Sequence, residues 1–147
     1  MALATVGGVG RAPVASGTCG SLVAAPFLPA LAALRAGSRA SYGAVVLGIV
    51  AVAVWSAGRA EHVLGSRDHS RIVIDEVAGM VLAGVFLPGT WLAVGVAFVL
   101  FRLFDIVKPF PANLIDRRIE GGLGVVGDDL VAGAYAGLLT RLLLWLL

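Results

Sequence analysis

Residues 102–129 carry the charged groups in this chain that are best suited to chemistry. The stretch reads RLFDIVKPFPANLIDRRIEGGLGVVGDD and holds five of the nine carboxylates of a largely apolar sequence. Arg102, Asp105 and Lys108 are spaced three apart, so on a helix they form a stripe of cation, carboxylate and cation. The arginine could bind a phosphate as a planar fork and the lysine as a point charge. The alternative is that both cations only extend along the apolar surface toward water.

Acidic residues also lie where apolar sequence meets polar sequence in three separate segments. These residues are Asp75-Glu76, Asp105 and Asp128-Asp129. Converging carboxylates repel one another and become partly protonated unless a cation neutralises them. Oxygen ligands, without a cysteine cluster or a histidine pair at metal spacing, favour Mg²⁺ or Mn²⁺. We therefore predict a divalent-metal site; the alternative is that each acid only caps a helix or pairs with a nearby cation.

Apolar helices must position these groups. The 147 residues suit one domain, residues 1–147. A hydrophobic content of 59% and a mean hydropathy of +0.98 are typical of a membrane protein. Five apolar runs predict helices, at residues 22–34, 41–60, 72–87, 90–104 and 130–147. We expect an all-α fold, a compact membrane-embedded bundle of about five main helices with its active site on one face; a soluble all-α bundle is the alternative.

The segments between the runs carry their own signals. The first twenty residues are glycine-rich and predict a loop, with Thr18 or Ser21 capping the helix that follows. Pro109 and Pro111 end the fourth run, because proline lacks a backbone donor and clashes with the preceding turn. Residues 121–127 predict a glycine-rich loop that leads to the last helix. Within that helix, Gly133 and Gly137 have the GxxxG spacing of closely packed membrane helices.

Short turns predict antiparallel neighbours, so successive helix ends alternate between two faces. All nine carboxylates, Asp68 included, and eight of the eleven cations then fall on one face. Helix starts are expected there after Ser21, near Asp75 and after Asp129, and free amides at helix starts favour anions. The excess of Lys and Arg predicts that this face is cytoplasmic. The N-terminus lacks signal-peptide features, so insertion through the protein's own helices is expected.

Several classes of function are disfavoured. A net charge of +2 with scattered basic residues gives no surface for nucleic acid. A single cysteine excludes a disulfide framework and a cysteine-based zinc site. The GxGxxG pattern at residues 122–127 follows no predicted strand, which argues against a dinucleotide site. No feature of the sequence fixes an oligomeric state.

Four ordered motifs resemble the phosphatidylglycerophosphatase A family of bacterial membrane lipid phosphatases. They are GTCGSL, DHSRIVIDEVAGM, FRLFDIVKPFP and IDRRIEGGLGVVGDDLVAG, which together extend over most of the chain. The resemblance implies Mg²⁺-dependent removal of the terminal phosphate of phosphatidylglycerophosphate, giving phosphatidylglycerol. It also implies a bacterial inner-membrane protein whose active site faces the cytoplasm and acts on a phospholipid. Ser16 stands where members of the family often have proline, so this segment lacks that stiffening residue.

The resemblance also implies roles for individual residues. The acids expected to be catalytic are Asp75, Glu76, Asp105, Asp128 and Asp129. Those expected to hold the metal are Asp75, Asp128 and Asp129 with Asp105, and Glu76 would be a general base or an outer ligand. The residues expected to bind substrate are Thr18, Gly20, Ser21, Arg102 and Lys108, to which we add Arg117. Activated water and a covalent aspartyl-phosphate both stay open as mechanisms.

A small membrane protein that binds or transports a cation through the same carboxylates is the alternative function. Transport would favour acids in the middle of membrane helices. Here the sequence places them near the ends of the apolar runs, which favours the phosphatase.

Overall fold

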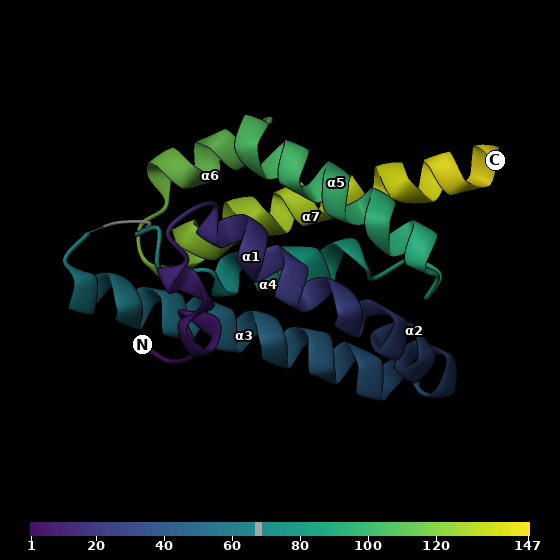
Figure 1. The fold of residues 1–147 in the computed structure, drawn as a ribbon, viewed down its shortest axis with the longest axis horizontal. Helices are drawn as coiled ribbons and strands as arrows, with labels where there is room; N and C mark the ends of the chain where they lie inside the picture. Colours follow the sequence, from purple (N-terminus) through teal and green to yellow (C-terminus); the bar gives the residue numbers. More distant parts are fainter. Residues whose placement is uncertain (67–68) are drawn as a thin grey trace.

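The computed structural model describes residues 1–66 and 69–147, so Asp68 lies outside the described residues. These residues form an all-helical bundle without a strand, which confirms the predicted fold class (Figure 1). The elements are η1 (Val6–Arg11), α1 (Ser16–Ala24), η2 (Ala25–Phe27), α2 (Leu28–Gly37), α3 (Arg39–Leu64), α4 (Ile74–Ala83), α5 (Trp91–Val107), α6 (Ala112–Arg118) and α7 (Gly122–Leu146). As the prolines predict, α5 ends before Pro109.

Helices α4 and α7 form the centre of the bundle. α7 packs along α4, and α1, α3 and α5 surround this pair. A Cβ atom added to Gly133 would lie 2.2 Å from the carbonyl oxygen of Gly79, and one added to Gly137 would lie 2.6 Å from that of Ala83. The two backbones therefore touch at these glycines, which confirms the close packing predicted from the GxxxG spacing.

Three segments are long and apolar enough to cross a membrane, judged by length and composition: 16–37, 39–64 and 122–146. The other two apolar helices are shorter. α5 has 17 residues, or roughly 26 Å, against a hydrocarbon core of about 30 Å. α4 has 10 residues, or roughly 15 Å, and most of its side chains are buried. It is an internal helix that the longer ones surround.

The predicted glycine loop at 121–127 is wrong, because α7 already begins at Gly122. These glycines allow close contact with neighbouring backbone and do not form a flexible loop. A Cβ atom on Gly122 would lie 1.9 Å from the carbonyl oxygen of Val54, and one on Gly124 would lie 1.9 Å from that of Ile119. Asp128-Asp129 consequently lie about two turns inside α7 and not at its start.

The predicted caps of the first helix are also wrong. α1 begins at Ser16 behind Ala15, which adopts a left-handed conformation with φ 51°, and no side chain caps the helix. Thr18 and Ser21 lie inside α1, where the Ser21 hydroxyl donates to the carbonyl of Gly17 at 2.9 Å. Serine inside a helix commonly bonds to the preceding turn in this way. Of the three helix starts expected on the acidic face, the one near Asp75 lies where the sequence predicts it.

The ends of the helices divide into two groups. The N-terminus, α6, the C-terminal end of α3 and the starts of α4 and α7 lie at one end of the bundle (Figure 1). The turn between α2 and α3 and the C-terminus lie at the other end. The acidic residues that the structure describes belong to segments of the first group or, for Asp105, to the C-terminal end of α5, which leads into α6. We call the end with the first group the acidic end.

We predict that Gly133→Ala destabilises the protein by about 1–3 kcal/mol, as overpacking does. The added methyl would meet a backbone carbonyl of α4, which cannot move unless the two helices separate. Thermal unfolding in detergent measures the effect. Gly48→Ala is the matched control, because that glycine lies in α3 with nothing within 4 Å of its added Cβ. Equal melting temperatures for the two variants would contradict a tight contact between α4 and α7.

Candidate active site

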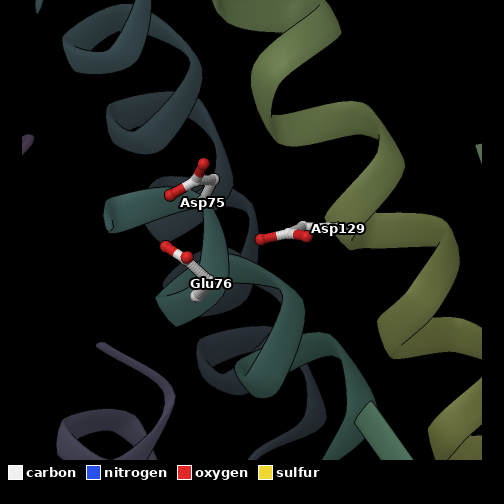
Figure 2. A group of neighbouring side chains, drawn as sticks. All are labelled: Asp75, Glu76 and Asp129. Atoms are coloured by element: carbon white, nitrogen blue, oxygen red, sulfur yellow. The ribbon is translucent and has the colours of Figure 1, made fainter. Parts of the chain in front are cut away.

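Three carboxylates from two helices meet at the acidic end. Asp75 and Glu76 lie in the first turn of α4, and Asp129 extends from α7 toward them (Figure 2). One oxygen of each lies within 4.8 Å of the others. Asp75 is 5% exposed and Asp129 is 3% exposed. Oxygens at this separation are within reach of one shared cation. We call these three residues the acid cluster.

The cluster fits a bound metal ion chemically. The Oε2 atom of Glu76 is buried, and no group in the described parts of the chain forms a hydrogen bond with it. Burial raises the pKa of the Glu76 carboxyl, and the charge of Asp105 raises it further, against the opposing effects of a hydrogen bond with Asp75 and the charge of Arg102. A divalent cation would neutralise the carboxylates and occupy the unused oxygen. The cluster could therefore hold a metal.

Arg102 borders the acid cluster. Its Nη1 atom lies 2.7 Å from Asp105 Oδ2 and donates to the hydroxyl of Ser21 at 3.4 Å. Asp105 in turn lies close enough to Asp129 for the two carboxyl groups to interact electrostatically. The Nε atom of Arg102 is buried and has no hydrogen-bond partner in residues 1–66 and 69–147. The guanidinium thus connects α5 to α1 and retains a donor for a further acceptor.

The first turn of α1 lies directly against these groups. A Cβ atom on Gly17 would lie 2.0 Å from Glu76 Oε1 and 3.2 Å from Arg102 Nη1. One on Gly20 would lie 2.9 Å from the carbonyl oxygen of Val73, just before α4. Sequence reasoning included Gly20 and missed Gly17, although two glycines three apart on one helix face were a signal for close approach. The free amides at the start of α1 accordingly lie beside the acid cluster.

Lys108 forms ion pairs with two carboxylates. Its Nζ atom lies 2.6 Å from Asp128 Oδ2 and 3.2 Å from Asp116 Oδ1. Burial lowers the pKa of Lys108, but hydrogen bonds with and charges of Asp128 and Asp116 outweigh this, so the net pKa is raised. The lysine therefore stays protonated and connects α5, α6 and α7. Sequence reasoning missed the pairing with Asp116.

Asp128 and Asp129 face different partners. Consecutive side chains on a helix point about 100° apart. Asp129 consequently lies in the acid cluster, whereas Asp128 contacts Lys108. The roles assigned from sequence, Asp128 as a metal ligand and Lys108 as a phosphate contact, stay predictions.

Two predicted substrate-binding residues lie apart from these contacts. Thr18 is half-buried within α1. Arg117 is exposed near the end of α6, and no ion pair joins it to an acid in the parts of the chain that the structure describes. The turn between α5 and α6 is itself held to α7, because the Tyr135 hydroxyl donates to the carbonyl of Phe110 at 2.9 Å.

The chain resembles known proteins over nearly its whole length. The family model described as phosphatidylglycerophosphatase A matches residues 2–144. The chain is 37% identical to Phosphatidylglycerophosphatase A of Escherichia coli strain K12 over 134 residues, which are 90% of this chain and 76% of that protein. It is 34% identical to the "Putative phosphatidylinositol-3-phosphatase" of Bacteroides thetaiotaomicron strain VPI-5482, over 95% of this chain and 90% of that protein.

A third relative matches a shorter region. Phosphatidylglycerophosphatase A of Haemophilus influenzae strain Rd is 42% identical over 74 residues, which are 50% of this chain and 45% of that protein. No solved structure matches the chain. The family model and the Escherichia coli relative both extend over most of the chain. The chain belongs to the phosphatidylglycerophosphatase A family.

Proposed function

We propose that this protein is a Mg²⁺-dependent lipid phosphatase that removes the terminal phosphate of phosphatidylglycerophosphate and leaves phosphatidylglycerol. The observation that carries the proposal is the acid cluster, whose three carboxylate oxygens lie within 4.8 Å of one another beside Arg102. The names of the Escherichia coli and Haemophilus influenzae relatives support this substrate. The Bacteroides relative carries the name of a different lipid phosphatase, so selectivity has to be measured.

The surroundings of the site suit a lipid phosphomonoester. Such a substrate keeps its acyl chains in the bilayer and places its phosphate among polar groups. Ile106, Val107 and Phe110 are exposed apolar residues that flank Lys108 at the end of α5. They provide an apolar surface beside the charged groups, on which the glycerol and the upper acyl chains could lie. A soluble phosphate ester would gain nothing from this surface.

Each group has a defined task in the proposed reaction. Asp75 and Asp129 hold the metal, and Glu76 either completes the ligand set or accepts a proton from the attacking water. A bound Mg²⁺ or Mn²⁺ supplies positive charge and Lewis acidity for phosphate hydrolysis. The unused donor of Arg102 and the free amides at the start of α1 bind phosphate oxygens as their charge increases. Attack on phosphorus by an aspartate is the second route that this arrangement allows: it would break the bond to the lipid's glycerol oxygen, which leaves as the alcohol, and water would then hydrolyse the aspartyl-phosphate.

We predict that activity depends on a bound divalent metal ion. Purified protein in detergent should release inorganic phosphate from phosphatidylglycerophosphate with Mg²⁺ present, and EDTA should abolish release until Mg²⁺ is restored. The physical reason is that the acid cluster repels a phosphate unless a cation neutralises it. Phosphatidylinositol-3-phosphate and phosphatidic acid, assayed in parallel, measure selectivity. Phosphate release that is unaffected by EDTA would exclude the metal-dependent mechanism.

We predict that removal of either proposed metal ligand lowers activity. Asp75→Asn and Asp129→Asn should each lower kcat by about 100-fold or more, a loss of the size seen when one electrostatic contact to a transition state is removed. The assay is phosphate release at saturating Mg²⁺. Glu120→Gln is the matched control, because it removes one exposed negative charge from the same end of the bundle.

Size-exclusion chromatography shows whether each variant still folds and enters micelles. Asp128→Asn adds a comparison. If Asp128 is a metal ligand, Asp128→Asn should raise the Mg²⁺ concentration needed for half-maximal activity. If Asp128 only pairs with Lys108, the substitution should change stability and leave that concentration unaltered. Near-normal kcat in both Asp75→Asn and Asp129→Asn would contradict the proposed site.

We propose that the protein lies in the bacterial inner membrane with the acidic end in the cytoplasm, because most of the Lys and Arg residues belong to that end. In a Cys19→Ala background, a cysteine at Ser38 should react with an impermeant maleimide added to intact cells. A cysteine at Ser66 should react only after permeabilisation. The two serines lie next to opposite ends of α3, so the experiment includes its own control. The reverse labelling pattern would invert the proposed orientation.

One observation favours the alternative of a cation-binding or transport protein. Asp129 lies about two turns inside α7, in a segment long enough to cross a membrane, as an ion pathway requires. The phosphate-release assay separates the two functions, since a cation carrier without phosphatase activity would leave the lipid intact.

A further inference from the structure

A cavity lined by two arginines lies at the end of the bundle opposite the acid cluster. It has a volume of about 540 Å³, and its polar lining comes from Arg35, Arg39 and Tyr42, with Phe86 as the largest apolar contributor. These residues belong to the end of α2, the start of α3 and the turn after α4. α4 runs between the two sites, from the acid cluster at its first turn to this cavity just beyond its last (Figure 1).

One cation of the cavity is held rigidly. The guanidinium of Arg35 donates to the carbonyl oxygens of Val85 and Leu87, and its central carbon lies 6.0 Å from the centre of the Tyr42 ring. These contacts fix the position of the guanidinium but do not neutralise its positive charge, because none of them is with a carboxylate. The other cation, Arg39, is the first residue of α3 and is exposed, so it can adjust to a ligand.

These two positive charges have no counterion among the residues that the structure describes. In the parts of the chain that the structure describes, no ion pair joins Arg35 or Arg39 to a carboxylate. The described acids belong to the segments at the acidic end, on the far side of the bundle. A pair of arginines in a pocket favours an anion, and the planar guanidinium matches phosphate oxygens in particular. The missing counterion is therefore expected to come from outside the chain.

The position of the cavity indicates the kind of anion. It lies where the segments 16–37 and 39–64 meet, which are two of the three segments able to cross a membrane. Residues at such a junction lie near the lipid headgroups. Phe86 is 62% exposed and gives the cavity an apolar rim. An acyl chain could contact this rim while the phosphate contacts the arginines.

We propose that this cavity binds the phosphate of an anionic phospholipid in the leaflet opposite the acid cluster, through Arg39 and the fixed guanidinium of Arg35. A zwitterionic lipid brings its own ammonium group and would be disfavoured beside two arginines. The proposal does not depend on the phosphatase function.

Binding of short-chain dioctanoyl phosphatidylglycerol to the purified protein in a zwitterionic detergent tests the proposal, with the rise in melting temperature as the readout. Both ends of the protein could respond to this lipid, so the comparison with Arg39→Gln isolates the cavity. In Arg39→Gln, the part of the stabilisation that comes from the cavity should require about ten times more lipid, the loss of affinity expected for one hydrogen bond to a charged group. Arg39→Lys, which keeps the charge, should retain part of the affinity.

Arg141→Gln is the matched control, because it removes one exposed cation from the last turns of α7 without altering the cavity lining. Arg39 is exposed, so its replacement should leave the fold intact, and circular dichroism verifies this. Unchanged affinity in Arg39→Gln, or an equal loss in Arg141→Gln, would overturn the proposal. Equal stabilisation by dioctanoyl phosphatidylcholine would overturn the requirement for an anionic lipid. Equal stabilisation by inorganic phosphate would overturn the requirement for a lipid.

Discussion

Mutual repulsion among the buried carboxylates of α4 and α7 is the constraint on which the rest of the structure depends. Two unit charges about 4.8 Å apart repel by roughly 3–4 kcal/mol at an effective dielectric constant of about 20. Three ionised groups contain three such pairs, which together approach the whole net stability of an ordinary domain, about 5–15 kcal/mol. The cluster therefore requires either bound protons or a cation. Close packing of glycines keeps α4 and α7 from separating in response, since Gly133 and Gly137 bring their backbones into contact.

The two neighbouring acids of α7 resolve this constraint in different ways. Asp128 is neutralised from within, by a lysine at 2.6 Å whose position fixes the junction of α5, α6 and α7. In the part of the chain that the structure describes, no salt bridge joins Asp129 to a cation, and the guanidinium of Arg102 contacts Asp105. A buried ion pair contributes little net stability, but it holds its partners in a defined geometry. The internal pair thus orients α7 and leaves the acid cluster as the place where an external cation gains most.

Much of this arrangement could be predicted from sequence, because it follows from local rules. The apolar runs predict an all-α bundle, the prolines after α5 predict its end, and the spacing of Gly133 and Gly137 predicts close contact. The convergence of Asp75, Glu76 and Asp129 was expected because each lies near a boundary between apolar and polar sequence, and the structure brings the three together.

Other features depend on tertiary contacts that leave no local signal. The glycine-rich composition of residues 121–127 suits both a flexible loop and a helix that packs closely against a neighbour. The sequence does not reveal the close contact with Val54, which favours the helix. Lys108 reaches Asp128 because it adopts a left-handed conformation, with φ 47°, at the end of α5. The three-residue spacing of Arg102, Asp105 and Lys108 on an ideal helix could not predict that change of direction.

The shortness of α4 connects the two ends of the molecule. A helix of roughly 15 Å is much shorter than α3 and α7 beside it, so it ends partway along the bundle, and its last carbonyls need other partners because buried backbone groups without partners are costly. The amide of Val85 donates to the carbonyl of Leu82 in the last turn of α4 at 3.0 Å, and the amide of Leu87 donates to the carbonyl of Gly84 at 3.1 Å. The carbonyls of Val85 and Leu87 accept from Arg35. Arg35 thus provides a partner for two carbonyls of this turn. A short central helix can therefore hold the acid cluster inside the bundle, because a residue from α2 satisfies the backbone where that helix stops.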